Sequence, residues 1–210
     1  MRVIAGEVGG FRLRGPADRG TRPMTDKIKS ALFSMLASLG AEPDRVLDLY
    51  AGTGGLGIEA LSRGALQAEF VEQAPKAMAV VRANIEHCRY TDVTVTHQTS
   101  VAAFIARGAI GSEPFDLVFM DPPYADEDIV ERLVQLGEST LLQSGALVVL
   151  GHWPRLTPPE RAGRLSLLRS RCHGDSCFTV YERTDDVSDT ASPPTPAPIS
   201  PDDLTQERHR

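Results

Sequence analysis

A glycine-rich turn between an apolar strand and a helix constrains the fold of this chain most strongly. The apolar run VLDLY (residues 46–50) leads into Gly52-Thr53-Gly54-Gly55-Leu56-Gly57, and a helical pattern follows over residues 55–63. The six residues match G-x-G-x-x-G, in which glycines let the backbone approach a bound nucleotide closely. Further strands alternate with helical segments, which predicts an α/β fold with a mostly parallel sheet and helices on both faces.

The expected elements follow from hydrophobic periodicity and capping signals. Thr25 is a plausible N-cap for a helix that ends near Gly40. Arg2–Ala5 and Phe11–Arg14 are expected to form a short N-terminal hairpin. Core strands are expected at 46–50, 68–72, 93–96, 115–120 and 146–150, with helices at 55–63, 75–88, 100–108 and 126–142 and a closing hairpin at 165–171 and 177–182.

Charge is distributed unevenly along the 210 residues, whose net charge is −6. Residues 1–30 have a local balance of +4, whereas residues 184–210 carry six acids and two arginines. Clustered positive charge is the usual footprint of phosphate binding, so a nucleic-acid contact is expected near the N-terminus. The acidic tail has five prolines between 193 and 201 and is expected to be disordered.

Several function classes are disfavoured by what the sequence lacks. No apolar run is long enough to span a membrane, and the N-terminus does not resemble a signal peptide, so a cytoplasmic protein is expected. Cys88, Cys172 and Cys177 form no C-x-x-C motif and are expected to be reduced thiols. The five histidines show no metal-binding spacing, so no metal is expected.

Two carboxylates flank the glycine turn. Glu72 lies 20 residues after Gly52, a spacing at which an acid binds ribose hydroxyls in NAD enzymes and equally suits the ribose of S-adenosylmethionine. Asp48 precedes the glycines, where it would repel a pyrophosphate and attract an α-ammonium group. The pair favours S-adenosylmethionine over NAD, with the capping of nearby amides as the alternative role of Asp48.

A second motif, Asp121-Pro122-Pro123-Tyr124, follows the strand at 115–120 and is expected beside the glycine turn. Proline has no N–H, so the carboxylate and the proline carbonyls present acceptors only. Such acceptors suit the exocyclic amino group of a base and would orient its lone pair toward a methyl group. Tyr124 offers a face on which the base could stack. The combination with the acid-flanked turn disfavours the alternative of a strand-ending turn without function.

The segments MRVIAGEVGGFRL, TRPMTDKIKSALFSML, VLDLYAGTGGLGIEALSRGA, FVEQ and DPPY, in this order, resemble the RsmD family of bacterial 16S rRNA guanine-N2 methyltransferases. The resemblance covers about residues 1–183. It implies a Rossmann-like, seven-stranded class I methyltransferase sheet, preceded by an RNA-engaging hairpin and loop at 1–24. The methyltransferase domain would occupy 25–183 and the disordered tail 184–210. The implied reaction transfers a methyl group from S-adenosylmethionine to one guanine of small-subunit ribosomal RNA, free or in an assembled particle, and a monomer is expected.

The resemblance also implies a set of site residues. The methionine end of the cofactor would lie at Asp48, Gly52 and Gly54, and its ribose at Glu72. Ser100 stands where relatives commonly have an acid that binds adenine, and Arg12 and Arg14 could equally form a solvated strand face. The full expected set comprises catalytic Asp121, Pro122, Pro123 and Tyr124; cofactor-binding Asp48, Tyr50, Gly52, Thr53, Gly54, Glu72, Gln73 and Ser100; and substrate-binding Arg12, Arg14, Arg22 and Pro23.

Three other functions match parts of the pattern. An amino-methyltransferase for DNA adenine or protein glutamine would share the D/N-P-P-Y element, although Asp rather than Asn at 121 favours a nucleic-acid base. An NAD(P) oxidoreductase would need a Tyr, Ser or Lys set for hydride chemistry, and none is convincing. A non-catalytic RNA-binding assembly factor would not need Asp48, Glu72 and the second motif.

Overall fold

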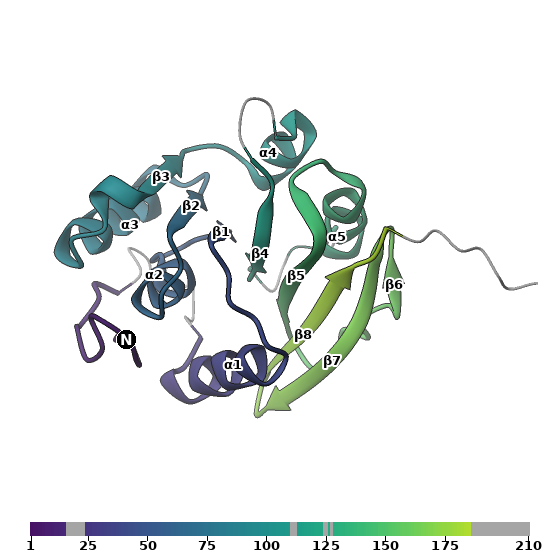
Figure 1. Cartoon of the computed structure of the whole chain (residues 1–210), viewed down its shortest axis with the longest axis horizontal. Coiled ribbons are helices and arrows are strands. Elements are labelled where there is room, and N and C mark those ends of the chain that lie inside the picture. The colour runs from purple at the N-terminus through teal and green to yellow at the C-terminus, as the bar shows by residue number, and fades with distance from the viewer. Residues whose placement is uncertain (16–23, 110–112, 124–125, 127, 186–210) are drawn as a thin grey trace, which may run out of the picture.

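The computed structural model describes residues 1–15, 24–109, 113–123, 126 and 128–185. Its centre is a single sheet in the order β3-β2-β1-β4-β5-β8-β7-β6 (Figure 1). The strands are β1 (Arg45–Leu49), β2 (Gln67–Val71), β3 (Thr94–His97), β4 (Phe115–Met120), β5 (Leu142–His152), β6 (Arg161–Ala162), β7 (Leu165–His173) and β8 (Ser176–Arg183). The first five strands pair in parallel, and the last three pair antiparallel.

Helices cover both faces of the sheet, as the alternating pattern predicts. They are α1 (Asp26–Ser38), α2 (Gly55–Ser62), α3 (Pro75–His87), α4 (Val101–Arg107) and α5 (Ile129–Glu138), with a short 3-10 helix η1 (Thr91–Val93) before β3. Apolar side chains of α1, α2 and α3 form one core with the sheet, and those of α4 and α5 form a second core on the other face. No described helix is long and apolar enough to cross a membrane.

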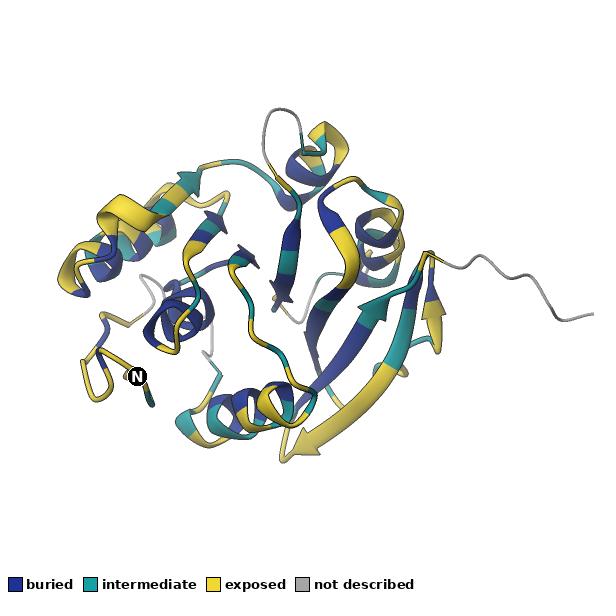
Figure 2. Cartoon of the chain, viewed as in Figure 1, coloured by how far each residue is buried: buried dark blue, intermediate teal, exposed yellow. Residues whose placement is uncertain are grey.

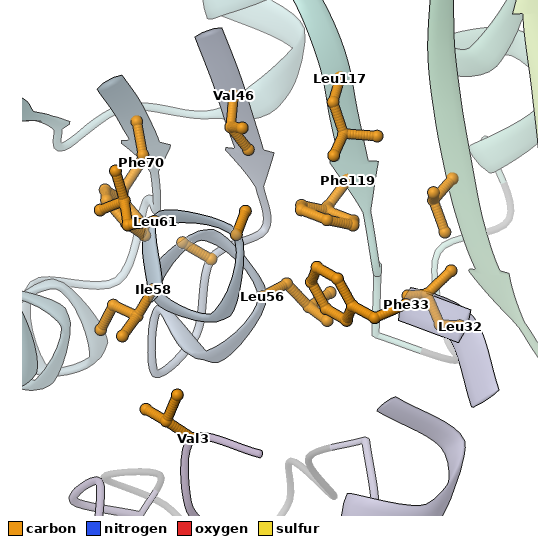
Figure 3. Packing of buried hydrophobic residues seen from close by; sticks show 14 of the residues in the cluster. Val3, Leu32, Phe33, Val46, Leu56, Ile58, Leu61, Phe70, Leu117 and Phe119 are labelled. Carbon is orange, nitrogen blue, oxygen red and sulfur yellow. The ribbon is translucent and has the colours of Figure 1, made fainter. Parts of the chain in front are cut away.

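The core brings the first helix onto the central strands. Phe33 of α1 faces Phe119 of β4, with ring centroids 5.7 Å apart, and Val3 of the N-terminal segment points toward α2 (Figure 3). Figure 2 shows that β4 is mostly buried, whereas much of β7 is exposed at the edge of the sheet. The site described below therefore rests on the best-packed strands of the molecule.

Most expected elements are confirmed within a few residues. The strand at 115–120 is β4, and Thr25 caps α1 by accepting a hydrogen bond from the N–H of Ile28. The helix expected at 126–142 is shorter, because the buried Leu141 and Leu142 lead into β5. Apolar residues at the junction of a helix and a strand fit either periodicity, so sequence alone places such a boundary poorly.

The expectation of seven strands is wrong by one, since eight occur within the described residues. The additional strand, β6, consists of Arg161 and Ala162, which pair with Ser166 and Leu165 at the start of β7. A two-residue strand has no alternation of polar and apolar residues, so the sequence carries no signal for it. The other seven strands are those that the sequence predicts.

The N-terminal hairpin forms, but its regular pairing is reduced to a single bridge between Arg2 and Arg12. The N–H of Val3 donates to the Phe11 carbonyl over 3.0 Å, and that of Gly10 donates to the Val3 carbonyl over 2.9 Å. The N–H groups of Ile4 and Ala5 bond to Glu59 of helix α2, and those of Glu7 and Val8 bond to Ser62 of the same helix, rather than to a second strand. The two regular strands expected here are therefore absent from the described structure.

The expectation of three reduced cysteines is wrong for two of them. Cys172 and Cys177 form a disulfide between β7 and β8, whereas Cys88 is a buried free thiol. The two cysteines are directly paired across the antiparallel strands, which brings their Cα atoms within 4.0 Å. The sequence spacing alone did not show that they face each other on neighbouring strands.

Candidate active site

The carboxyl ends of β1, β2 and β4 meet at one edge of the sheet and gather the expected acids. In the parallel register Leu49 lies beside both Val71 and Met120. Glu72 and Asp121 directly follow those two partners, so they flank the residue that leaves β1 from either side. The electrostatic effects of Glu72 and Asp121 both reach Asp48. The structure therefore brings together carboxylates that are far apart in the sequence.

The turn after β1 has a backbone path that ordinary residues rarely adopt. Gly52 and Gly54 have φ values of 57° and 74°, in the left-handed region that glycine enters without strain. The Gly54 N–H donates to the Ala51 carbonyl over 2.7 Å, which closes the turn. Helix α2 begins directly afterwards, with Gly54 as an N-cap that has no side chain. The cap residue itself therefore offers no side-chain acceptor to the first N–H groups of α2.

Glu72 bridges the glycine turn and the start of α3. Its Oε2 accepts a hydrogen bond from the Gly52 N–H over 3.0 Å, and its Oε1 accepts one from the Ala74 N–H over 2.8 Å. Each carboxylate oxygen has a second lone pair, so the group can accept further hydrogen bonds. The two backbone donors fix the carboxylate beside the turn, where the sequence places a ribose-binding acid.

Asp48 is a buried carboxylate on β1 that is 2% exposed. Burial raises its pKa to about 8, against the lowering effect of a hydrogen bond from the Gly57 N–H to Oδ2, which is 2.9 Å long. This bond is the amide-capping role that the sequence left open. Capping the Gly57 N–H does not exclude binding of an α-ammonium group, because Asp48 keeps its second oxygen. A cationic partner would also stabilise the ionised form of this buried carboxylate.

Asp121 lies at the end of β4 and packs against β5. Desolvation raises its pKa to about 6. Gly151 of β5 leaves the room for it, because a Cβ at Gly151 would lie 2.2 Å from Oδ1 of Asp121. Within the described residues no hydrogen bond is donated to this carboxylate. It is therefore a half-buried acceptor that is free to receive a donor from a bound molecule.

The two prolines that follow differ in their surroundings. Pro122 is buried and Pro123 is exposed. The Pro123 carbonyl accepts a hydrogen bond from the Asp126 N–H over 3.0 Å, so one of the expected free acceptors already has a donor. Tyr124, the expected stacking residue, lies outside the described residues.

Other residues of the expected cofactor set have different surroundings. Thr53 is buried in the glycine turn, and Gln73 is exposed after Glu72. Ser100 caps helix α4, where its Oγ accepts a hydrogen bond from the Ala103 N–H over 3.2 Å. The Ser100 hydroxyl therefore serves as a helix cap, and this position carries no acidic side chain that could bind adenine.

The expected substrate-binding arginines are only partly described. Arg12 and Arg14 are exposed on the N-terminal segment, whereas Arg22 and Pro23 lie outside the described residues. Both backbone groups of Arg14 bond to Asn84 of α3. The segment is thereby held in place while the arginine side chains stay in solvent.

Sequence reasoning missed the polar residues that attach this segment to the glycine turn. Asn84 is fully buried; its Oδ1 accepts from the Arg14 N–H over 2.8 Å, and its Nδ2 donates to the carbonyls of Arg14 and Thr53 over 3.2 and 2.8 Å. Glu59 of α2 and Lys29 of α1 are also buried, and together they bond the first residues of the chain. The sequence signal that could have revealed these residues is the presence of a polar side chain at a position on the apolar, buried face of each helix.

Comparison with known proteins agrees with this geometry. Residues 1–182 match the family model described as conserved hypothetical protein 95. The chain is 33% identical over 183 residues to "Putative rRNA methyltransferase YlbH" of Bacillus subtilis, which covers 87% of this chain and 99% of the relative. It is 28% identical to ribosomal RNA small subunit methyltransferase D of Escherichia coli, over 87% of this chain and 90% of the relative.

A solved structure shows the same arrangement. The yhhF protein of Escherichia coli superposes with a TM-score of 0.76 at 28% identity, over 89% of this chain and 99% of that one. The family match extends over the N-terminal segment, the glycine turn and the strand that carries Asp121. The chain therefore belongs to the conserved hypothetical protein 95 family, which is the RsmD methyltransferase family that its motifs resemble.

Proposed function

We propose that this protein transfers a methyl group from S-adenosylmethionine to the exocyclic N2 of one guanine in small-subunit ribosomal RNA. The observation that carries the proposal is the position of Asp121, an acceptor without a described donor, at the same edge of the sheet as Asp48 and Glu72. The names of the relatives support methyl transfer to ribosomal RNA, since two of them are rRNA methyltransferases by name. We place the enzyme in the cytoplasm, acting as a monomer.

The residues present fit S-adenosylmethionine at both of its ends. The buried Asp48 would hold the α-ammonium group, a cation that relieves the cost of ionising this carboxylate. Glu72 would accept hydrogen bonds from the ribose hydroxyls through the lone pairs that Gly52 and Ala74 leave free. Gly52, Thr53 and Gly54 would provide the closely approaching backbone. Tyr50, Gln73 and Ser100 complete the proposed cofactor-binding set.

The proposed substrate end is built around Asp121 and Pro122. The carboxylate would accept a hydrogen bond from the guanine amino group, which orients the nitrogen lone pair toward the methyl donor. Pro122 and Pro123 provide backbone without N–H groups beside it. Tyr124 is proposed as the stacking surface on the basis of its sequence position alone. The target base must leave its stack to reach this site, which costs least for a loop nucleotide.

The cofactor would supply an electrophilic methyl group on a positively charged sulfur. The guanine N2 would be the nucleophile, so the chain itself need not provide one. The residues of the chain would bind the cofactor, orient the guanine amino group and accept its proton. Asp121 would hold the amino group while the methyl carbon leaves sulfur and bonds to nitrogen, and it would accept the proton that the nitrogen then loses. Desolvation at the end of β4 strengthens this interaction, because a hydrogen bond to a carboxylate is stronger away from water.

We infer that RNA is engaged by the segment 1–24, ahead of a methyltransferase domain at 25–183. Arg12 and Arg14 are exposed on this segment and would contact phosphates, with Arg22 and Pro23 nearer the substrate entrance. Asn84 links Arg14 to the glycine turn, so RNA contacts would be held at a fixed position relative to the cofactor. The tail proposed at 184–210 lies outside the described residues from 186 onward.

One assay tests the proposal directly. Purified protein and S-adenosylmethionine labelled in its methyl group are incubated with one acceptor per reaction: small ribosomal subunits from a strain that lacks the enzyme, naked ribosomal RNA, or DNA. Binding of NAD to the protein is measured in parallel. Label in N2 of a guanine of the small-subunit RNA is expected. Label in DNA adenine, or binding of NAD without methyl transfer, would overturn it.

A matched pair of variants ties the activity to the site. Asp121→Ala should reduce transfer at least about a hundredfold, since it removes the group that orients the amino nitrogen. Cofactor affinity should stay within about twofold of wild type, because Asp121 is not placed in the cofactor-binding set. Asp92→Ala, at an exposed acid in η1, is the control and should leave both quantities unchanged. Equal effects of the two substitutions would contradict the assignment.

A further inference from the structure

Tyr50 joins the glycine turn to the segment that carries Asp121. Its hydroxyl donates a hydrogen bond to Oδ2 of Asp126 over 2.8 Å, although 76 residues separate the two in sequence. Asp126 in turn donates its backbone N–H to the Pro123 carbonyl over 3.0 Å. The first residue after β1 is therefore bonded to a segment that directly follows β4.

Arg132 of α5 contacts the same oxygen of Asp126 as Tyr50 does. Its Nε lies 3.5 Å from Oδ2 of Asp126, and its Nη2 lies 2.9 Å from Oδ2 of Asp128. The Oδ1 of Asp126 accepts a further bond from the Asp128 N–H over 3.2 Å. The side chains of Arg132 and Asp126 are only 22% and 14% exposed, so their ion pair forms largely out of water, where it is strong, whereas the side chain of Asp128 is 63% exposed.

The backbone of Tyr50 supports a positioning role. Its φ is 59°, a left-handed conformation that is unfavourable for a residue with a side chain. The adjacent Ala51 N–H donates to the Val71 carbonyl over 3.0 Å, so the chain turns out of β1 while still bonded to β2. A conformation of this kind persists where surrounding contacts hold it, and such residues concentrate at functional sites.

We propose that Tyr50 is a positioning residue that, through Asp126 and Arg132, fixes the Asp121–Pro123 segment relative to the cofactor turn. The inference rests on the proposed function, because it assigns this residue a role in that reaction. Asp126 would stay paired with Arg132 if the hydroxyl were removed, but its direct bond to the cofactor turn would be lost. Methyl transfer requires the amino nitrogen and the methyl group at a fixed separation, so the rate should depend on this bond more than substrate affinity does.

The test compares Tyr50→Phe with Tyr181→Phe. Tyr181 is a buried residue of β8 whose hydroxyl donates to the Pro159 carbonyl over 3.0 Å, so the control also removes one tyrosine hydroxyl bond. At saturating cofactor and RNA, Tyr50→Phe should lower the single-turnover rate about tenfold. The KM for RNA should stay within about twofold. Equal rates for the two variants, or a loss confined to KM, would overturn the inference.

A double-mutant cycle tests whether the residues act as one unit. Asp126→Asn should also lower the rate, and the combination with Tyr50→Phe should be little worse than the more severe single variant. Fully multiplicative losses would show that Tyr50 does not act through Asp126. The comparison of the double variant with the two single variants therefore distinguishes a shared positioning role from two independent effects.

Hydrogen–deuterium exchange tests the connection without any RNA. In protein saturated with S-adenosylhomocysteine, Tyr50→Phe should speed exchange of the Asp126 and Asp128 N–H groups and leave Gly57, bonded to Asp48, unchanged. Unchanged exchange at Asp126 and Asp128 would overturn the inference. If the wild-type protein labelled no RNA, the proposed function would fail, and the exchange rates would still decide whether Tyr50 holds this segment.

Discussion

Lys29 and Glu59 form a buried ion pair, with Nζ 3.0 Å from Oε2 and side chains that are 2% and 0% exposed. Glu59 also accepts hydrogen bonds from the N–H groups of Ile4 and Ala5, at 2.7 and 3.1 Å. Lys29 donates to the Arg2 carbonyl over 2.7 Å. The pair therefore takes the place of a partner strand and attaches the N-terminal segment to α1 and α2.

Removing the lysine charge should destabilise the protein strongly. Lys29→Met keeps a similar length of side chain but leaves the Glu59 carboxylate buried with less compensation, which typically costs about 3 kcal/mol. Urea unfolding measures this loss. Lys27→Met, two residues away on the exposed side of α1, should change stability by less than about 0.5 kcal/mol. Equal stabilities for the two variants would show that the buried pair contributes little.

Asn84→Asp should loosen the contact between the N-terminal segment and the glycine turn. The carboxylate can still accept from the Arg14 N–H but cannot donate to the carbonyls of Arg14 and Thr53. The buried Thr53 carbonyl and the partly buried Arg14 carbonyl would face a charge, so the free energy of unfolding should fall by roughly 2–4 kcal/mol. Gln135→Glu makes the same chemical change on the exposed face of α5, where loss of its hydrogen bond to Glu131 and the new like-charge pair should cost only about 0.5 kcal/mol. Thermal unfolding of both variants at one pH makes the comparison.

These buried polar contacts mark the limit of what the sequence could predict. The convergence of Asp48, Glu72 and Asp121 was predictable because each lies in or directly after an apolar strand, and parallel strands bring their carboxyl ends to one edge. Glu59 and Asn84 carry no such signal. Their backbone partners lie 31 to 70 residues away in sequence, and only the packing of the N-terminal segment and the glycine turn decides which helix faces receive them.

Short and antiparallel elements were predicted least well for a related reason. The strand β6 is too short to show a pattern, and the Cys172–Cys177 pairing depends on the register of β7 and β8. Likewise, the Tyr50–Asp126 bond depends on the left-handed turn at Tyr50, which sequence rules assign to glycine rather than to an aromatic residue. Register and strained turns are set by tertiary packing, so local periodicity does not specify them.

The pH dependence of methyl transfer should report on Asp121. Its pKa is raised to about 6 by desolvation, and the ionised form is the one that accepts a hydrogen bond from the amino group. The single-turnover rate should therefore rise with pH through about 6 and level off above it. Asp121→Asn should remove this limb of the profile, because the amide does not titrate. A wild-type rate that is constant from pH 5 to 7 would rule out the role of this ionisation.

Cofactor affinity should vary with pH through Asp48. In the free protein its pKa is raised to about 8, so at lower pH the carboxyl holds a proton that a bound α-ammonium group would displace. Affinity should rise with pH by at most about tenfold per unit up to about 8. Calorimetry in buffers of different ionisation enthalpy should detect the released proton at pH 7. Asp48→Asn should bind more weakly and should release no proton from this position.

Gly151→Ala, in the neighbouring strand β5, should displace the Asp121 carboxylate. The added methyl group would lie 2.2 Å from Oδ1 of Asp121, so the carboxylate must move or the two strands must separate. Overpacking of this kind typically costs about 1–3 kcal/mol of stability, and displacement of the orienting acceptor should lower the transfer rate at least about tenfold. Gly15→Ala, whose new methyl group meets no atom within 4 Å, is the control for stability alone, because this glycine lies in the segment proposed to engage RNA. Thermal unfolding is measured for both variants, and the transfer rate of Gly151→Ala is compared with that of the wild type. A Gly151→Ala protein with wild-type rates would mean that the position of the Asp121 carboxylate does not limit methyl transfer.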